Sequence, residues 1–333
     1  MIKGEILSII QKSFPLVQKP FLDIASKFGI SEDEVLKILQ EEKANKIIRQ
    51  TSAIFDTKRL GYESSLVAFE VAKEDIDDAV KVINSHPGVS HNYERNHSFN
   101  IWFTLAIQPN SKFGLNKTVE ILAKLTKAKA FITLPTLKMF KIAVKLDTAN
   151  SDKIKEKVAK RKFKEIELTP KYLEVIKKVQ HDIEIVSEPF KNIVDELNLS
   201  YDEFFSILEE LKEAGVMRRF ASILNHRKAG FNANAMVVWD IDEKQGEKIG
   251  KNAAEFSAVS HCYLRPKYPN WPFNLFTMIH GKTKEETDGK IAEIANEISH
   301  RSKMHLYSSR EFKKVRIVYF IDSFTEWENS IKV

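Results

Sequence analysis

The sequence predicts an α+β protein made of two copies of one unit, each a winged helix-turn-helix followed by a ferredoxin-like βαββαβ domain. Three observations predict this fold: an internal repeat, a helix-rich start to each copy, and strands alternating with helices in the remainder. An antiparallel sheet with helices on one face leaves its other face open, so we expect the two copies to cover each other as a pseudo-dimer.

The repeat pairs residues at a nearly constant offset. Arg49 recurs as Arg218, an offset of 169 residues (218 − 49), and His91 recurs as His261, an offset of 170 (261 − 91). Residues 148–168 are rich in Lys and Glu and read as a linker. The expected domains are therefore helix-turn-helix domains at 1–60 and 169–229, and ferredoxin-like domains at 61–147 and 230–333.

Each copy begins with three short helices and a wing. Pro20 opens the second helix, Gly29 ends it, and Ser31 with Glu34 forms a capping box for the third. The expected elements of the first copy are helices at 3–12, 20–28 and 31–42 and a wing strand at 46–55, and the second copy repeats them with a capping box at Ser200 and Glu203.

The second part of each copy alternates strands and helices. In the first copy we expect strands at 65–71, 89–95, 100–108 and 140–146, with helices at 75–85 and 116–127. In the second copy we expect strands at 234–241, 259–265, 273–279 and 315–321, with helices at 245–256 and 284–300.

A helix-turn-helix usually indicates DNA binding, with its third helix in the major groove. Here the third helices, 31–42 and 200–213, each carry five acidic residues and one lysine. Such helices repel phosphates, whose neutralisation supplies most non-specific DNA affinity. We therefore expect helix-turn-helix folds without a DNA partner.

Composition narrows the class of protein further. At 333 residues the chain exceeds one hydrophobic core, and its net charge of +6 is modest for that length. No run of 18 apolar residues occurs, and residues 1–15 lack the features of a signal peptide. The single cysteine, Cys262, excludes a disulfide framework and a thiolate zinc site. These features favour a cytoplasmic protein without a membrane partner.

Two strands carry an unusual face. Because side chains alternate along a strand, one face of the first is expected to hold His91, Tyr93, Arg95 and His97, and the matching face of the second His261, Tyr263, Arg265 and Lys267. A titratable ring, a phenol and cations make a poor core face but suit a flat anionic ligand. For either copy alone a solvated face is the simpler interpretation; the duplication favours a site.

The order of elements resembles the Lrp/AsnC regulator family. Ser90-His91-Asn92-Tyr93-Glu94-Arg95-Asn96-His97 resembles a motif of the first subunit of siroheme decarboxylases, and Ser260-His261-Cys262-Tyr263-Leu264-Arg265-Pro266 resembles one of the second. The resemblance covers essentially the whole chain. It implies a fusion of the two subunits that removes carbon dioxide from two acetate side chains of siroheme, giving 12,18-didecarboxysiroheme for haem d1 or alternative haem biosynthesis.

The resemblance also implies a carboxy-lyase with no cofactor beyond the iron tetrapyrrole substrate, and it is compatible with a homodimer and with other tetrapyrrole-pathway enzymes as partners. Two alternatives stay open. One is a transcription regulator with a small effector in the sheet domain, and the other is a non-catalytic haem-binding sensor.

Roles for single residues follow from this chemistry. Proton transfer to the ring carbon suits histidine, so His91 and His261 are the expected catalytic residues. The planar guanidinium of arginine binds a carboxylate through two parallel hydrogen bonds. A surface ion pair is nevertheless the simpler role for any single arginine of this sequence. The expected substrate-binding residues are Arg95, Arg265, Arg49, Arg218, Lys267, His97 (also a candidate axial ligand of the substrate iron), Tyr93, Tyr263 and Trp102, for which core packing is an equal alternative. His86, His280 and the remaining histidines lack a comparable setting.

Overall fold

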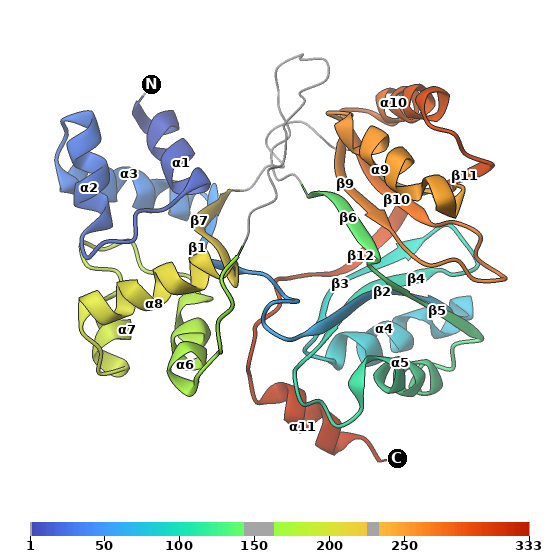
Figure 1. The fold of residues 1–333 in the computed structure, drawn as a ribbon, viewed down its shortest axis with the longest axis horizontal. Coiled ribbons are helices and arrows are strands. Elements are labelled where there is room, and N and C mark those ends of the chain that lie inside the picture. Colours follow the sequence, from blue (N-terminus) through green and yellow to red (C-terminus); the bar gives the residue numbers. More distant parts are fainter. Residues whose placement is uncertain (1, 143–162, 225–232, 333) are drawn as a thin grey trace. The chain divides into compact units, whose positions relative to one another are not determined.

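The computed structural model describes residues 2–142, 163–224 and 233–332, arranged in two units (Figure 1). The first unit holds the described residues of 1–62, 160–226 and 318–322, and the second those of 63–159, 227–317 and 323–333. Each repeat therefore contributes its helix-turn-helix to the first unit and its sheet domain to the second. Most of the predicted linker lies outside the described residues, and 163–168 contain neither helix nor strand.

The first unit matches the predicted helix-turn-helix elements closely. Both capping boxes are present, with Ser31 and Ser200 accepting the N–H of Glu34 and Glu203. Its elements are α1 (Ile2–Lys12), α2 (Pro20–Phe28), α3 (Glu32–Ala44), β1 (Ile48–Phe55), α6 (Pro170–Val179), α7 (Lys191–Glu196), α8 (Tyr201–Glu213) and β7 (Met217–Leu224).

The two wings pair with each other. Strands β1 and β7 form an antiparallel two-stranded sheet in which the hydroxyls of Thr51 and Ser222 lie 2.7 Å apart. Around it, Phe190 packs edge to face on Phe14 and on Phe220, and the rings of Phe14 and Phe220 are tilted by 41°. Each wing thus completes the other, and the two helix-turn-helix halves share one core.

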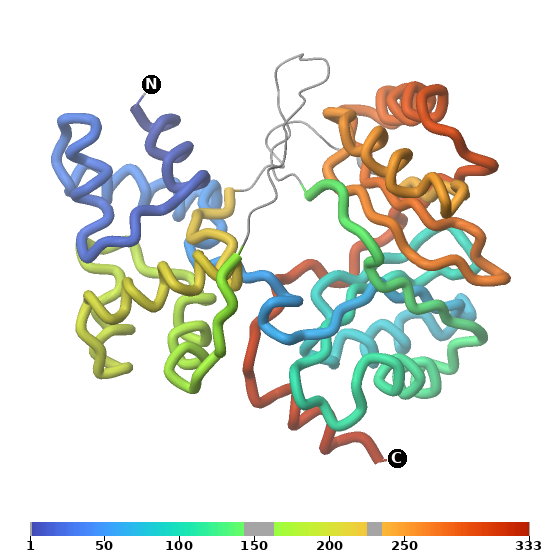
Figure 2. Tube along the Cα trace, in the orientation of Figure 1, coloured from blue at the N-terminus to red at the C-terminus, as the bar shows by residue number. Residues whose placement is uncertain are grey.

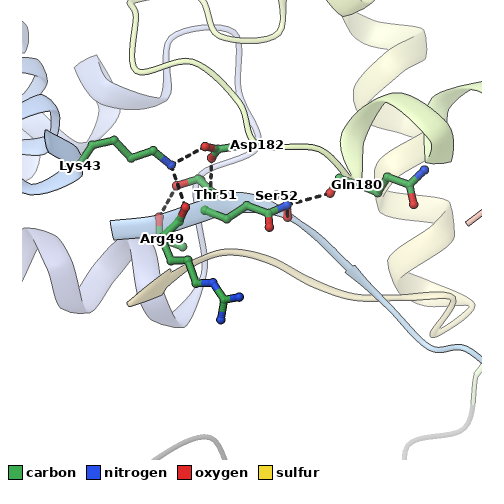
Figure 3. Close-up of polar contacts among 8 residues, drawn as sticks. Lys43, Arg49, Thr51, Ser52, Gln180 and Asp182 are labelled. Atoms are coloured by element: carbon green, nitrogen blue, oxygen red, sulfur yellow. Dashed lines mark hydrogen bonds and ion pairs between the residues drawn. The ribbon is translucent and has the colours of Figure 1, made fainter. Parts of the chain in front are cut away.

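The loop after α6 is fastened to α3 and β1, as Figure 3 shows. Asp182 accepts the N–H of Thr51 at 2.7 Å and forms an ion pair with Lys43. Lys43 also donates to the carbonyl of Arg49 at 3.0 Å. The acidic third helix of the first copy is thus held by contacts within its own unit.

The second unit contains two five-stranded sheets. Its elements in the first repeat are β2 (Glu63–Glu70), a short 3-10 turn (Lys73–Asp75), α4 (Ile76–Ser85), β3 (Val89–Arg95), β4 (Ile101–Ile107), α5 (Gly114–Leu125), β5 (Ala130–Pro135) and β6 (Lys138–Ile142). Those of the second repeat are β8 (Ala233–Asp240), a 3-10 turn (Glu243–Gln245), α9 (Gly246–Glu255), β9 (Val259–Leu264), β10 (Leu275–Gly281), α10 (Lys284–Glu297), β11 (Ser302–Leu306), β12 (Ser308–Lys314) and α11 (Ser323–Ser330).

The repeats exchange their last strands. The sheet orders are β12-β3-β4-β2-β5 and β11-β8-β10-β9-β6, so β6 joins the sheet of the second repeat and β12 joins that of the first. The predicted strands at 140–146 and 315–321 are therefore wrong in place or extent. The fourth strand of each repeat is β5 or β11, residues 143–146 lie outside the described part, and 315–321 form no strand. Tyr319 instead packs on Tyr62 in the first unit, with ring centroids 5.1 Å apart.

The predicted pseudo-dimer is confirmed. Helices α4 and α5 cover the outer face of one sheet, and α9 and α10 cover that of the other (Figures 1 and 2). The inner faces pack on each other through apolar side chains of both repeats, among them Trp102, Leu134, Trp271 and Phe276. No helix in the described ranges is long and apolar enough to cross a membrane.

A glycine in the turn before β3 allows the backbone to approach β4 closely. The N–H of Ala106 donates to the carbonyl of Gly88 at 2.9 Å, and a Cβ on Gly88 would lie 1.8 Å from the carbonyl oxygen of Ala106. We expect Gly88→Ala to lower the free energy of unfolding by about 1–3 kcal/mol, because the backbone must shift to relieve overpacking. Denaturant unfolding measures the change.

Gly289→Ala is the matched control for this substitution. Gly289 lies within α10, and a Cβ there meets nothing within 4 Å. Alanine is favoured over glycine inside a helix, so the control is expected to gain about 0.5–1 kcal/mol. Equal stability of the two variants would contradict the close approach at Gly88.

Candidate functional site

Each of the two histidine strands contains a β-bulge at its serine–histidine pair. In β3, Val89 faces Leu105 and His91 faces Thr104, so Ser90 is the extra residue. In β9, Val259 faces Ile279 and His261 faces Met278, so Ser260 is extra. Each bulge lets a serine hydroxyl reach the ring of the adjacent histidine.

The rest of each strand alternates as predicted. Asn92 and Cys262 are fully buried on the helix side, where they contact Asn84 of α4 and the carbonyl of Gly250 in α9. The histidine and tyrosine of each strand therefore face the other sheet, and all four are half-buried. Their rings stack at 6.3 Å for His91 with Tyr93 and at 6.2 Å for His261 with Tyr263.

The first bulge places His91 among hydroxyls and a lysine. Ser90 Oγ lies 3.0 Å from His91 Nδ1 and 2.7 Å from Thr104 Oγ1. The N–H of His91 also donates to Thr104 Oγ1 at 3.2 Å. Across the neighbouring strand, Lys314 of β12 faces His91. This site combines an oriented imidazole with an adjacent cation.

The second bulge holds two imidazoles. Ser260 Oγ lies 2.8 Å from His261 Nδ1 and 2.6 Å from His280 Nε2. Burial lowers the pKa of His261. The pKa of His280 is lowered to about 4, mainly by burial and also by the charges of His261, Lys290 and Lys314. Both rings are therefore neutral at pH 7.

Sequence reasoning missed His280. Its counterpart in the first repeat is Ala106, so the comparison of the two copies gives no signal at that position. The available signal was the antiparallel pairing of β9 with β10, which brings the end of β10 to the start of β9, where Ser260 lies. The two sites share a serine and a tyrosine beside the histidine, but the residues paired across the sheet differ. They are Thr104 and Lys314 in the first site and Met278 and Ile142 in the second, which also has His280.

The predicted arginines at the ends of these strands connect the two sheets. Arg95 donates from Nη1 to the carbonyl of Leu306 on β11 at 2.8 Å, and Arg265 donates from Nη1 to the carbonyl of Leu134 on β5. The two arginines are only 6% and 8% exposed, and burial lowers the pKa of each to about 10. We call this reciprocal pair of contacts the arginine clasp.

The clasp carries charge without a protein counter-ion. Among the described residues, no carboxylate lies within ion-pair distance of Arg95 or Arg265. Each guanidinium instead lies over a tyrosine ring, Arg95 at 5.2 Å from the centroid of Tyr93 and Arg265 at 5.0 Å from the centroid of Tyr263. The Nε of each has no hydrogen-bond partner. Burying an unpaired charge is costly, so these cations are retained against stability. Their contact with substrate carboxylates stays a prediction.

His97 and Lys267 do not lie on the predicted strand faces. Strand β3 ends at Arg95 and strand β9 ends at Leu264, so His97 and Lys267 lie in the loops that follow. His97 accepts the N–H of Phe99 on Nδ1 at 3.0 Å. Lys267 forms an ion pair with Asp240. The expected shared face is therefore wrong for these two residues, and their substrate contacts stay predictions.

Trp102 belongs to the core between the sheets. It is 1% exposed, its Nε1 donates to the carbonyl of Phe99 at 2.7 Å, and its ring lies 5.2 Å from that of Trp271. The structure confirms core packing, the alternative expected for Trp102, because the opposite sheet covers its ring. The packing of Trp102 on a ligand stays a prediction.

Arg49 and Arg218 lie on the paired wing strands of the first unit. The side chain of Arg49 points away from Asp182 (Figure 3). Arg218 is exposed, with Nε 3.9 Å from a carboxylate oxygen of Asp56. Their role in substrate binding stays a prediction.

A groove of about 670 Å³ in the first unit is lined by residues of the segment 178–196 and by none of the predicted site residues. In the part of the chain that the structure describes, no group of three or more His, Cys, Asp or Glu side chains is arranged to hold a metal ion.

The fold and the paired sheets define a class: a protein of the AsnC-like architecture in which two copies are fused. An AsnC-like ligand binding domain model matches residues 59–141 and 228–313, and a siroheme decarboxylase NirDL-like HTH domain model matches 4–49 and 173–218. The chain is 40% identical to a siroheme decarboxylase of Hydrogenobacter thermophilus, over 97% of this chain and 96% of that protein. The chain belongs to the siroheme decarboxylase family.

Two further likenesses agree. A siroheme decarboxylase NirDL subunit of Paracoccus denitrificans is 28% identical over 93% of this chain and 94% of its own length. Crystal structures of the siroheme decarboxylase NirDL, one of them in co-complex with an iron-uroporphyrin III analogue, superpose with TM-scores of 0.82 and 0.81 at 35% and 34% identity. They cover 99% of this chain and 97% and 98% of those chains.

The arginine clasp makes a prediction about stability. Replacing a buried ion by an apolar side chain of similar size is often neutral or stabilising by about 1–4 kcal/mol, which offsets a lost hydrogen bond of about 0.5–1.5 kcal/mol. We therefore expect Arg95→Met and Arg265→Met to lose no more than about 1 kcal/mol of unfolding free energy. The control Trp102→Ala, in the same intersheet core, is expected to lose about 3–5 kcal/mol. An arginine variant as unstable as the tryptophan variant would contradict this account.

Proposed function

We propose that this protein is a siroheme decarboxylase, a carboxy-lyase that releases carbon dioxide from two acetate side chains of siroheme to give 12,18-didecarboxysiroheme. The observation that supports it most is the pair of β-bulges, each of which orients a half-buried histidine with a serine hydroxyl. The family, and the relative whose structure holds an iron-uroporphyrin analogue, support the same substrate class.

The reaction needs an acid placed at the reacting carbon. Each acetate loses carbon dioxide by cleavage of the bond between its carboxyl carbon and its methylene carbon. The electron pair left on the methylene is delocalised into the ring system and then takes a proton, which leaves a methyl group. In this proposal His91 and His261 supply that proton from Nε2, because the serine hydroxyls engage Nδ1. No cofactor besides the substrate's own iron is required.

Binding of the substrate is assigned to the cations and rings around the two histidines. Lys314 and the arginines Arg95 and Arg265 provide positive charge for the remaining carboxylates, and Tyr93 and Tyr263 provide flat surfaces beside the histidines. His97 stays a candidate axial ligand of the substrate iron. A homodimer of the fused chain and other partners in tetrapyrrole synthesis are further proposals.

A transcription regulator is the less favoured alternative. The third helices, α3 and α8, are acidic, and β1 and β7 pair with each other within the first unit. Both features weigh against an approach to phosphates, which a DNA-binding wing and helix require.

Anaerobic incubation with siroheme, followed by mass spectrometry, tests the activity. We expect a product lighter than siroheme by two carbon dioxide units. Siroheme recovered unchanged would refute the proposed function, and DNA binding that weakens steeply with added salt would favour the regulator.

The catalytic assignment is tested separately. We expect His91→Ala and His261→Ala each to slow loss of carbon dioxide by about 10²–10⁴-fold, because each removes a proton donor. His181→Ala, an exposed histidine lining the groove of the first unit, is the matched control and should keep wild-type rates. Full activity in both strand variants would reject the assigned residues and leave the reaction itself untouched.

A further inference from the structure

The second bulge contains an arrangement that the first lacks. Ser260 Oγ lies between two imidazole nitrogens, 2.8 Å from His261 Nδ1 and 2.6 Å from His280 Nε2. Ser260 is 5% exposed, so the protein itself supplies its main partners. A serine hydroxyl carries one proton and accepts others. The carbonyl of Met278, at 3.4 Å from Ser260 Oγ, is a longer contact than either imidazole nitrogen. In the arrangement with the shorter bonds, Ser260 donates to one histidine and accepts from the other, and the protonation of the two rings is coupled.

The surroundings of His280 favour its neutral form. The charged or titratable groups near it are His261 on β9, Lys290 and Glu286 on α10, and Lys314 on β12. Glu286 is paired with Lys290, and Lys290 Nζ points to the carbonyl of His280 at 3.4 Å. No carboxylate in the described residues is bonded to the His280 ring. The protonated, imidazolium form of either histidine is therefore unfavourable here. A proton can be transferred along the pair only if neither ring holds an extra proton.

We propose that Ser260 and His280 form a proton relay that refills His261 during decarboxylation, an inference that rests on the proposed function. At the start, His261 carries its proton on Nε2 and accepts the Ser260 hydroxyl on Nδ1, and Ser260 accepts the Nε2 proton of His280. When His261 gives its Nε2 proton to the substrate methylene, the Ser260 proton moves to His261 Nδ1. In the same concerted step the His280 Nε2 proton moves to Ser260 Oγ, and His280 Nδ1 takes one proton from solvent.

The proton balance of this step closes without a buried charge. One proton enters at His280 and one leaves at His261, and both rings end neutral with the proton on Nδ1. The step requires that His280 reach solvent, and its side chain is half-buried, not enclosed. The relay resets when His261 takes a proton on Nε2, its Nδ1 proton passes to Ser260, the Ser260 proton passes to His280 Nε2, and His280 Nδ1 returns its proton to solvent.

The first site has no such relay. Ala106 occupies the position of His280, and Ser90 is bonded to the Thr104 hydroxyl, which does not titrate near neutral pH. Lys314 is paired directly across from His91 on the neighbouring strand. The two acetates are therefore protonated by different routes, and His280 acts through His261 and only at the second site.

Substitution of His280 tests the relay through activity. We expect His280→Gln and His280→Ala to slow the loss of carbon dioxide by roughly tenfold or more, less than the about 10²–10⁴-fold expected for removal of the donor itself. Glutamine can keep the hydrogen bond to Ser260 but cannot pass a proton on, so a merely structural role predicts that His280→Gln retains wild-type activity. Added imidazole should restore part of the rate of His280→Ala.

The pH profile and Ser260 variants provide further readouts. The relay predicts that His280→Gln changes the pH dependence of kcat and that Ser260→Ala shows the same altered profile. Ser260→Thr, which keeps the hydroxyl, should retain the wild-type profile. Circular dichroism establishes that each variant is folded.

A measurement without substrate separates the relay from the reaction. Nitrogen-15 NMR of the histidine rings in the free chain should show that His280→Gln alters the tautomer population of His261 and leaves that of His91 unchanged. An unaltered His261 tautomer, or wild-type activity of His280→Gln at every pH, would overturn the relay while the proposed function stands. A wild-type chain that leaves siroheme unchanged would overturn the function, and the relay with it.

Discussion

The exchange of β6 and β12 between the two sheets is the constraint on which the rest of the second unit depends. Without β12, the strand of His91 would be a sheet edge, and without β6 the strand of His261 would be one. Edge strands expose unpaired backbone groups and define their side-chain positions poorly. The exchange makes each repeat necessary to complete the other's site, which gives a physical reason for the two copies to occur in one chain.

The same exchange makes the sites different. Because β12 and β6 have diverged, a lysine faces His91 and an isoleucine faces His261. The second site instead has a second imidazole, His280, bonded through Ser260. The arginine clasp, by contrast, is the same in both repeats. Each repeat has a buried arginine that donates to a leucine carbonyl in the opposite sheet. Symmetry is thus retained where the sheets are joined and lost beside the histidines.

Much of the fold could be predicted from local patterns. The capping boxes at Ser31 and Ser200 and the strand from Val89 to Arg95 depend on nearby residues alone, and the structure confirms them. The last strands could not be predicted in the same way. Their sequences, such as Lys138–Ile142, are short and half polar, and which sheet they join is decided by tertiary pairing.

The candidate site was predictable only in part. Strand alternation placed His91 and Tyr93 on one face, but it also carried the face to His97, beyond the residue where the strand ends. Alternation did not reveal the bulge at Ser90, because an extra residue shows only once the partner strand is known. His280 was missed for the same reason, since its contact with Ser260 crosses from one strand to the next.

The central claim is that the tetrapyrrole lies against the two bulged strands of the second unit. A crystal structure of this chain with an iron tetrapyrrole bound tests it most directly. The account predicts an acetate-bearing ring edge within about 3.5 Å of Nε2 of His91 or His261, the distance that proton transfer requires. A tetrapyrrole bound in the groove of the first unit, with both histidines untouched, would contradict it.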